Sequence, residues 1–253
     1  MKKPLVSVVV PCYNHGRFLE ATIQSVQKST WKSIEIIIVN DGSVDDSEDV
    51  AKKLVNQHKN IQYLYQQNAG PSVARNNGIS EARGGLILPL DADDLISPDY
   101  IEAAVKEFIN DPDLKLVYCE AEKFGAKSGK WKLEDFSLEK LAYKNMIFVS
   151  ALFKKTDWQK AGGFAEEMTW GFEDWEFWIS LLKSGGKVKK LPFTGFYYRI
   201  QQNSRRKSVD NFGRKKTVDF INKKHRDFIY TQLGGPLRHQ KSLSKFINRF
   251  RMK

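Results

Sequence analysis

Three carboxylates, Asp91, Asp93 and Asp94, stand within four positions directly after the apolar residues 86–90. The apolar run is typical of a buried parallel strand, so we expect the acids where that strand leaves its sheet. If the chain stays extended there, Asp91 and Asp93 share one face while the small Ala92 points to the other. Two such carboxylates can hold a hard divalent ion and leave positions open for water and phosphate oxygens. The stretch therefore predicts a site for a metal-bound nucleotide.

The same acids also allow a structural interpretation. They fit a solvated turn before a helix, with Asp94 or Ser97 as the N-cap and Pro98 at the first helical position. A calcium EF-hand loop fits poorly, because Leu95 and Ile96 occupy positions that need a ligand and a glycine. The choice between a metal site and a turn depends on the rest of the chain.

A second acidic segment, residues 170–178, places Glu173, Asp174 and Glu176 among five aromatic side chains. Desolvation by such neighbours raises the pKa of a carboxylate towards the working pH, which suits a general base. The alternative is an amphipathic helix for which Asp174 is only the N-cap.

The elements that must position these acids alternate between strand and helix. Runs rich in Val and Ile at 5–10, 34–39, 61–65 and 86–90 predict strands, and segments with helical spacing follow the first three. This pattern predicts an α/β fold with a mostly parallel central sheet flanked by helices. The carboxyl ends of parallel strands meet at one edge, where ligands bind. The loops 11–16, 40–43, 67–70 and 91–94 should therefore gather in one pocket.

Common phosphate-binding loops are missing from the sequence. Neither GxxxxGK[ST] nor GxGxxG follows the first strand, which argues against P-loop enzymes and dinucleotide oxidoreductases. Asp41, at the end of the second strand, could accept a hydrogen bond from the imide N–H of uracil. Its alternative role is to close an Asx-turn in Asp41-Gly42.

Four blocks carry a resemblance to a known family. Residues 7–14 (SVVVPCYN), 39–43 (VNDGS), 68–76 (NAGPSVARN) and 90–94 (LDADD) resemble, in order and spacing, the signatures of the family 2 glycosyltransferases. The resemblance implies a GT-A, Rossmann-like fold, a nucleotide-sugar donor, Mn²⁺ or Mg²⁺ as cofactor, and transfer with inversion at the anomeric carbon. A sugar-nucleotide pyrophosphorylase would instead need a glycine-rich loop after the first strand.

The resemblance also implies roles for individual residues. Asp93 is expected on the metal and Asp174 is expected to be the catalytic base, with Glu176 as the alternative if the register differs. Gln201 stands where many relatives have a histidine, which casts doubt on a metal ligand from that loop. The expected nucleotide-binding residues are Pro11, Tyr13, Asn14, Asp41, Gly70, Arg75, Asp91 and Ala92, and additional candidates are Asp94, Glu173 and Arg199.

The positive charge is concentrated at the C-terminal end. The chain has 253 residues and a net charge of +11, yet residues 199–253 alone hold 16 Lys and Arg against 3 Asp and Glu. We therefore predict a near-neutral catalytic domain at 1–204, with a nucleotide-binding half at 1–110 and an acceptor-binding half at 111–204. A basic helical extension follows at 205–253.

This extension ends in apolar residues with helical spacing, Leu243, Phe246, Ile247 and Phe250, among basic ones. Such a helix either lies on an anionic membrane surface or packs on the catalytic domain. Nucleic acid is not expected as a partner, because the extension lacks a recognised binding-fold signature.

Location and partners follow from the remaining features. No secretory signal and no apolar run of transmembrane length are found, and Cys12 and Cys119 have no CxxC partner. We expect a cytoplasmic protein with reduced, buried cysteines, located peripherally at the inner face of the membrane if its tail binds lipid. Its acceptor would be a glycan or lipid-linked glycan in cell-surface polysaccharide synthesis. The rival function is a sugar-nucleotide-binding or basic binding protein on the same scaffold.

Overall fold

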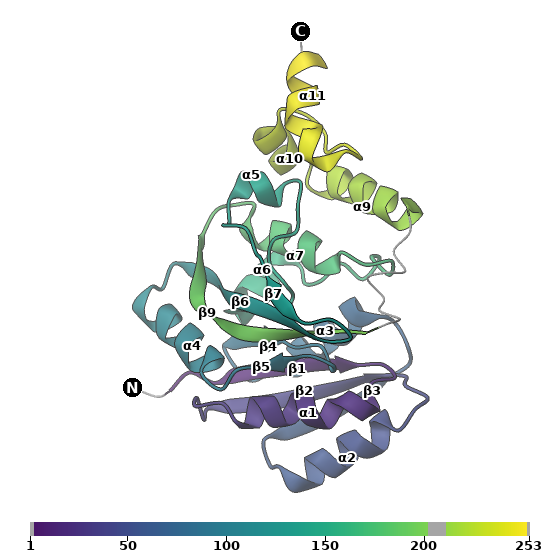
Figure 1. Ribbon diagram of the computed structural model, residues 1–253, viewed down its shortest axis with the longest axis vertical. Coiled ribbons are helices and arrows are strands. Elements are labelled where there is room, and N and C mark those ends of the chain that lie inside the picture. Colours follow the sequence, from purple (N-terminus) through teal and green to yellow (C-terminus); the bar gives the residue numbers. More distant parts are fainter. Residues whose placement is uncertain (1–2, 202–210, 252–253) are drawn as a thin grey trace.

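The computed structural model describes residues 3–201 and 211–251 (Figure 1). The first part of the chain follows the predicted alternation of strand and helix. Its elements are β1 (Val6–Cys12), α1 (Gly16–Gln27), β2 (Ile34–Asp41), α2 (Ser47–Gln57), β3 (Ile61–Gln66), α3 (Pro71–Glu81) and β4 (Leu86–Pro89). β1 pairs in parallel with β2 and with β4, and β2 pairs in parallel with β3. The loops that follow these strands therefore open on one edge of the sheet.

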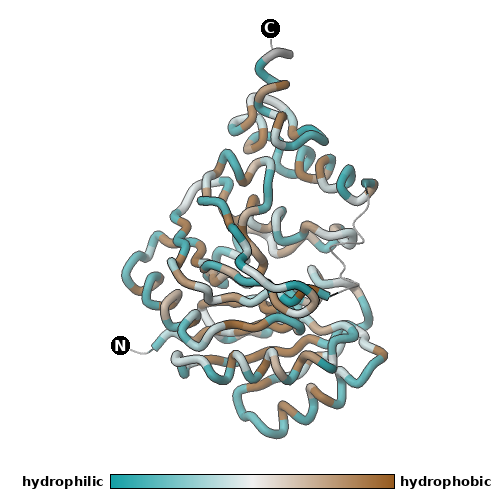
Figure 2. Tube along the Cα trace, viewed as in Figure 1, coloured by the Kyte–Doolittle hydropathy of each residue, from teal (hydrophilic) through white to brown (hydrophobic). Residues whose placement is uncertain are grey.

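The apolar runs explain the position of this sheet. Every residue of β2 is buried, and in β1 only Pro11 is partly exposed. Figure 2 shows the hydrophobic residues concentrated in these strands and on the inner sides of the helices beside them. Cys12 and Cys119 are free and buried, as predicted.

The second part of the chain extends the same sheet with a mixture of parallel and antiparallel strands. Its elements are β5 (Leu95–Ile96), α4 (Tyr100–Asn110), β6 (Leu114–Gly125), β7 (Gly129–Trp131), α5 (Leu138–Leu141), β8 (Leu152–Lys154), α6 (Lys155–Ala161), α7 (Glu173–Leu182) and β9 (Lys187–Ile200). The strand order is β3-β2-β1-β4-β8-β6-β9-β5, with β7 paired to β6. The long β6–β9 ladder is parallel, whereas β8 pairs antiparallel with both β4 and β6.

Two strands of this part differ from what their sequences suggest. The apolar stretch 148–153 is typical of one strand, but only Leu152–Lys154 form β8, and residues 147–149 line a cleft. The stretches 187–191 and 194–198 suggest two strands, but they form one continuous β9, whose pairing with β6 shifts register between Cys119 and Ala121.

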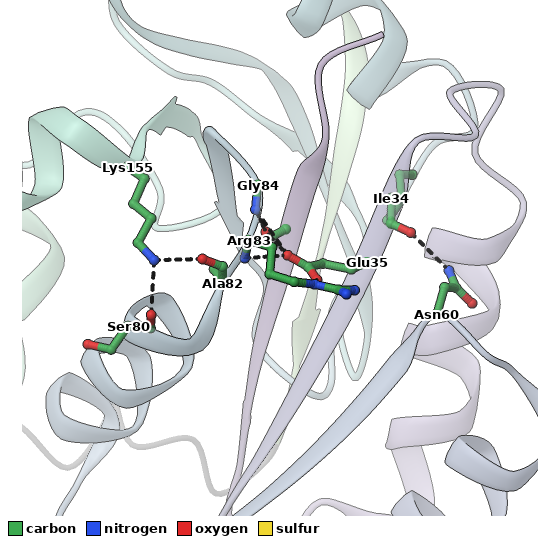
Figure 3. A network of polar contacts seen from close by, with 9 residues as sticks. Ile34, Glu35, Asn60, Ser80, Ala82, Arg83, Gly84 and Lys155 are labelled. Atoms are coloured by element: carbon green, nitrogen blue, oxygen red, sulfur yellow. Dashed lines mark hydrogen bonds and ion pairs between the residues drawn. The ribbon is translucent and has the colours of Figure 1, made fainter. Parts of the chain in front are cut away.

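The amino edge of the sheet is fixed by a buried acid (Figure 3). Glu35 of β2 accepts hydrogen bonds from Ser7 Oγ at 2.5 Å, from Gly84 N at 3.0 Å and from Arg83 through both its backbone N and its side-chain Nε at 2.7 Å. Burial raises the pKa of Glu35, but these bonds outweigh it and the net pKa is lowered. Glu35 therefore joins β1, β2 and the segment entering β4, at the end of the strands opposite the loops described above.

The C-terminal segment forms helices that pack on the body of the molecule at the top of Figure 1. They are α9 (Asn211–Lys224), α10 (Arg226–Leu233) and α11 (Ser244–Arg251), with a 3₁₀ turn, η1 (Lys241–Leu243), before α11. The stretch 209–230 has the spacing of one helix, but the structure divides it at His225, and residues 209 and 210 lie outside the described residues. No helix within 3–201 or 211–251 has the length and apolar character needed to span a membrane.

Candidate active site

One large cleft lies between the carboxyl ends of the strands and the C-terminal helices. Its volume is about 2090 Å³, more than a single small ligand fills, so two ligands have room together. Among its lining residues are Pro11, Tyr13, Asp41, Gly70, Arg75, Asp91, Ala92, Asp93, Asp94, Glu173, Asp174 and Arg199. Of the residues proposed from the sequence for nucleotide, metal and base, Asn14 and the alternative base Glu176 are not among them.

Asn14 instead braces the loop beside the cleft. Its backbone is left-handed (φ 55°), and its Oδ1 accepts a hydrogen bond from Val44 N at 2.8 Å. Its own N–H donates to Ser43 Oγ at 3.0 Å. The structure therefore places Asn14 in a loop-to-loop contact between residues 11–16 and 40–44.

Asp41 lies at one end of the cleft, at the end of β2. It is buried, and its carboxylate accepts hydrogen bonds from Gln66 Nε2 and Ala69 N at 2.8 Å and from Gly70 N at 3.0 Å. An ionised carboxylate has about four lone-pair positions, so one acceptor position is left for a ligand N–H. Asp41 thus anchors the 66–70 loop and keeps an acceptor position for a ligand.

Arg75 of α3 connects the two acidic segments. It is almost fully buried, donates to Asp91 at 2.7 Å and donates to Glu173 of α7 at 2.9 Å. Gly78, one turn later, lets α3 lie directly on the sheet, because a Cβ there would be 2.5 Å from Val9 Cγ1. Residues far apart in sequence are held together by this one guanidinium.

The stretch after β4 is a turn and not an extended strand, so the prediction that Asp91 and Asp93 share a strand face is wrong. Asp94 N donates to Asp91 O at 3.0 Å and closes the turn. Asp94 is buried, and its Oδ1 accepts from Arg199 N at 2.7 Å. Asp93 Oδ2 accepts from Gln201 Nε2 at 2.5 Å.

The helix-capping alternative is also wrong for this stretch. The next helix, α4, begins at Tyr100 with Asp99 at its N-cap position, so neither Asp94 nor Ser97 caps it. Asp94 instead holds the end of β9 against the turn through Arg199.

The chemistry of the turn fits a divalent cation. Burial and the neighbouring charge of Asp91 raise the pKa of Asp93, and an ion bound between them would relieve that repulsion. Among the described residues, no three His, Cys, Asp or Glu side chains form a complete metal site. Magnesium in nucleotide sites commonly takes one or two carboxylates and completes its shell with phosphate oxygens and water, and Asp93 with Asp91 suits that pattern.

Asp174 lies in the first turn of α7, so the alternative in which it is only the N-cap of this helix is wrong. Phe172, in a left-handed conformation (φ 65°), takes the N-cap position, with no side-chain cap. Asp174 is half-buried and accepts from Asn145 Nδ2 at 2.7 Å and from Trp175 N at 2.8 Å. Desolvation and the charge of Glu173 raise the pKa of Asp174 to about 6, although Asn145 and Arg75 oppose the rise.

Glu176, the alternative base, does not face the cleft. Its side chain is fully buried, and its Oε1 accepts from His225 Nε2 at 2.6 Å, Ser180 Oγ at 2.7 Å and Lys224 Nζ at 3.0 Å. Glu176 therefore attaches the C-terminal helices to α7, at a position two residues after Asp174.

Comparison with known proteins identifies the family. Residues 7–171 match the family model described as glycosyl transferase family 2. The chain belongs to this family. As a family 2 member, it is 29% identical over 224 residues to a chondroitin synthase of Pasteurella multocida, an alignment that covers 86% of this chain but 23% of the synthase. It is 33% identical over 194 residues to an uncharacterized glycosyltransferase, RP339, of Rickettsia prowazekii, covering 71% of this chain and 59% of that protein.

Solved structures of other proteins share the fold of this family 2 chain. Residues 1–349 of S. aureus TarS in complex with UDP give a TM-score of 0.72 at 18% identity, covering 98% of this chain and 72% of that one. The mannosyltransferase PcManGT of Pyrobaculum calidifontis, in complex with GDP-Man and Mn²⁺, gives 0.71 at 18% identity, covering the whole chain and 71% of that protein. The predicted GT-A fold is confirmed.

The cleft of this family 2 protein also contains residues that the sequence did not reveal. His15 lines it, and its Nε2 lies 3.1 Å from Gln201 Nε2, which bonds Asp93. Its place in the loop after the first strand was the available signal. Arg214 of α9 and Lys241 line the other end, although both fall in the segment predicted as an extension. No local pattern placed them there.

Proposed function

We propose that the chain is a metal-dependent, inverting glycosyltransferase that moves a sugar from a nucleotide diphosphate donor, a UDP-sugar, to a glycan hydroxyl. The carrying observation is that one cleft is lined both by Asp41, Asp91 and Asp93 and by Asp174, whose pKa is raised. TarS has been solved with UDP-GlcNAc and PcManGT with GDP-Man and Mn²⁺, which supports a nucleotide sugar as the donor class. We infer an acceptor from cell-surface polysaccharide synthesis.

The residues of the cleft divide the reaction between them. Asp41 offers its free acceptor position to the base of the nucleotide, and Asp91 lies where ribose and diphosphate would follow. Asp93, with Asp91, would hold Mn²⁺ or Mg²⁺, which supplies positive charge to the departing diphosphate. Asp174 takes the proton of the acceptor hydroxyl as its oxygen attacks the anomeric carbon. Arg75 holds the two acidic segments together through its ion pairs with Asp91 and Glu173.

Turnover separates this proposal from a protein that only binds sugar nucleotides. Incubation with UDP- and GDP-sugars and Mn²⁺ should give slow release of free nucleotide, whereas a binding protein would return the donor intact. Asp93→Asn should weaken Mn²⁺-dependent donor binding in calorimetry. Asp174→Asn, the matched amide substitution, should keep donor binding and lose transfer. The opposite outcome, with donor binding lost in Asp174→Asn alone, would contradict the assigned roles.

The last helix supports a second part of the proposal, contact with an anionic membrane. α11 docks through its polar side: Ser244 and Asn248 are buried, and Asn248 Nδ2 donates to Leu233 O and Pro236 O. Leu243, the last residue of η1, is 46% exposed, and Phe246 of α11 is 63% exposed. Lys245 and Arg249 lie on the same short helix as Phe246. A cationic helix with apolar side chains turned outward suits a lipid-linked acceptor at a membrane surface.

A further inference from the structure

Lys241 lines the cleft and lies over two aromatic rings. Its Nζ lies 4.9 Å from the ring centre of Phe172 and 4.5 Å from that of Trp175. These two aromatic residues flank Glu173 and Asp174 in sequence, and Phe172, Asp174, Trp175 and Lys241 all line the same cleft. The C-terminal segment thus places an ammonium group over the aromatic pair at the start of α7, beside the candidate base.

No carboxylate among the described residues lies within 4 Å of Lys241 or of Arg214, the second cation of this wall. The pKa of Lys241 is lowered, first by its burial and then by the nearby positive charge of Arg214. Lys144, elsewhere on the lining, differs because it pairs with Glu134. Two cations on one cleft wall with no carboxylate of the described residues beside them repel each other, and an anion between them would relieve the repulsion.

We propose that Lys241 and Arg214 bind an anionic group of the acceptor, a carboxylate or a phosphate, so that the acceptor is a negatively charged glycan. This inference rests on the proposed transferase function and narrows its substrate class. An anion held by this pair would bring an adjoining hydroxyl towards Asp174, while the faces of Phe172 and Trp175 limit the orientations of the sugar ring.

The aromatic contacts alone do not explain both cations. A lysine over aromatic rings is stabilised by cation–π attraction, which accounts for Lys241 as a packing residue. Among the described residues, Arg214 makes no such contact with these rings. Its positive charge nevertheless repels that of Lys241. An anion-binding role explains why both Lys241 and Arg214 lie on this wall, whereas aromatic packing explains Lys241 alone.

The test uses the full chain with UDP and Mn²⁺ and three oligosaccharide-sized probes: neutral maltotetraose, tetragalacturonate as the carboxylate and a glycerol phosphate trimer as the phosphate. Titration calorimetry at low salt should give at least tenfold tighter binding for one or both anionic probes than for the neutral one. Lys241→Gln and Arg214→Gln should each remove most of that preference, and Lys241→Arg should keep it. Lys215→Gln, the same loss of charge next to Arg214 but outside the cleft lining, should leave it unchanged.

Several outcomes would overturn the inference. These are equal affinity for neutral and anionic probes, no binding of either anionic probe, or a loss in Lys215→Gln as large as in Lys241→Gln. Nucleotide release from the donor, measured in the same preparations, distinguishes the two proposals. Release without an anion preference would reject the charged acceptor alone, whereas no release from any sugar nucleotide would reject the transferase function itself.

Discussion

At the scale of single residues, two adjacent acids of α7 have different environments. Glu173 receives the buried guanidinium of Arg75 at 2.9 Å, whereas Asp174 receives the neutral amide of Asn145 at 2.7 Å. A cation stabilises a carboxylate charge far more than an amide does. Glu173 is thereby an anchor, and Asp174 keeps a pKa near the range in which a general base works.

The pH dependence of transfer should report this environment. As the proposed base, Asp174 would act in its ionised form, so the rate should rise with one ionisation centred at about 6 and level off above it. At pH 5 the rate should be about tenfold below the plateau. Asn145→Ala removes a hydrogen bond to the charged form, so the midpoint should move to higher pH. An unchanged midpoint in Asn145→Ala would remove Asp174 from the role of base.

Stability should show the cost of keeping this base. The folded pKa of Asp174 is raised, so its ionised form costs stability at pH values above about 6, and the cost fades as the pH falls towards the unfolded value near 4. Asp174→Asn should therefore be more stable than the parent at pH 8 by about 1–2 kcal/mol, allowing for partial solvent screening. Urea unfolding at pH 8 and pH 4 checks this, and a gain at pH 4 as large as at pH 8 would refute the pKa argument.

At the scale of elements, α3 holds the loop after β4 against α7 through Arg75. Arg75→Met would leave Asp91 and Glu173 without their shared cation, at a cost of about 3–5 kcal/mol in unfolding free energy. Lys52→Met removes an exposed ion pair with Glu48 within α2 and should cost about 0.5 kcal/mol or less. Denaturant titration compares the two. Similar losses in both variants would mean that the Arg75 bridge does not hold these elements together.

Elements that depend on local pattern could be predicted, and those that depend on distant partners could not. The runs of Val and Ile in β1 and β2 specify parallel strands, and with them the edge where Asp41 and Asp91 meet. The turn at 91–94 depends on Arg199, which arrives 105 residues after Asp94. Likewise, the break at His225 depends on Glu176 of α7. No spacing in the sequence encodes such contacts.

At the scale of the whole molecule, the predicted extension contributes to the cleft it was expected to follow. α9 and the segment before α11 supply Arg214 and Lys241 to its wall. The division of the chain at 204 remains a prediction, and the same basic segment is proposed both to meet the acceptor and to meet the membrane.

Vesicle binding tests the membrane part of this proposal. The full chain should sediment with vesicles containing anionic phosphatidylglycerol and not with pure phosphatidylcholine, and added salt should weaken the association. Phe246→Ser removes an exposed apolar side chain and should reduce binding several-fold. Val44→Ser, which changes an 88% exposed side chain in the loop after β2, is the matched control. Equal binding by both variants would argue against α11 as the contact.

The buried bond between Glu176 and His225 limits how this protein can be re-engineered. α7 carries the proposed base, Asp174, in its first turn, and Glu176, half a turn later, binds His225 of the C-terminal segment. The same segment supplies Arg214 and Lys241 to the wall of the cleft. A chimera in which residues after 210 were replaced by a segment without Lys224 and His225 would leave the buried carboxylate of Glu176 without these two partners. New acceptor preferences are therefore better sought by changing the wall residues one at a time than by grafting tails.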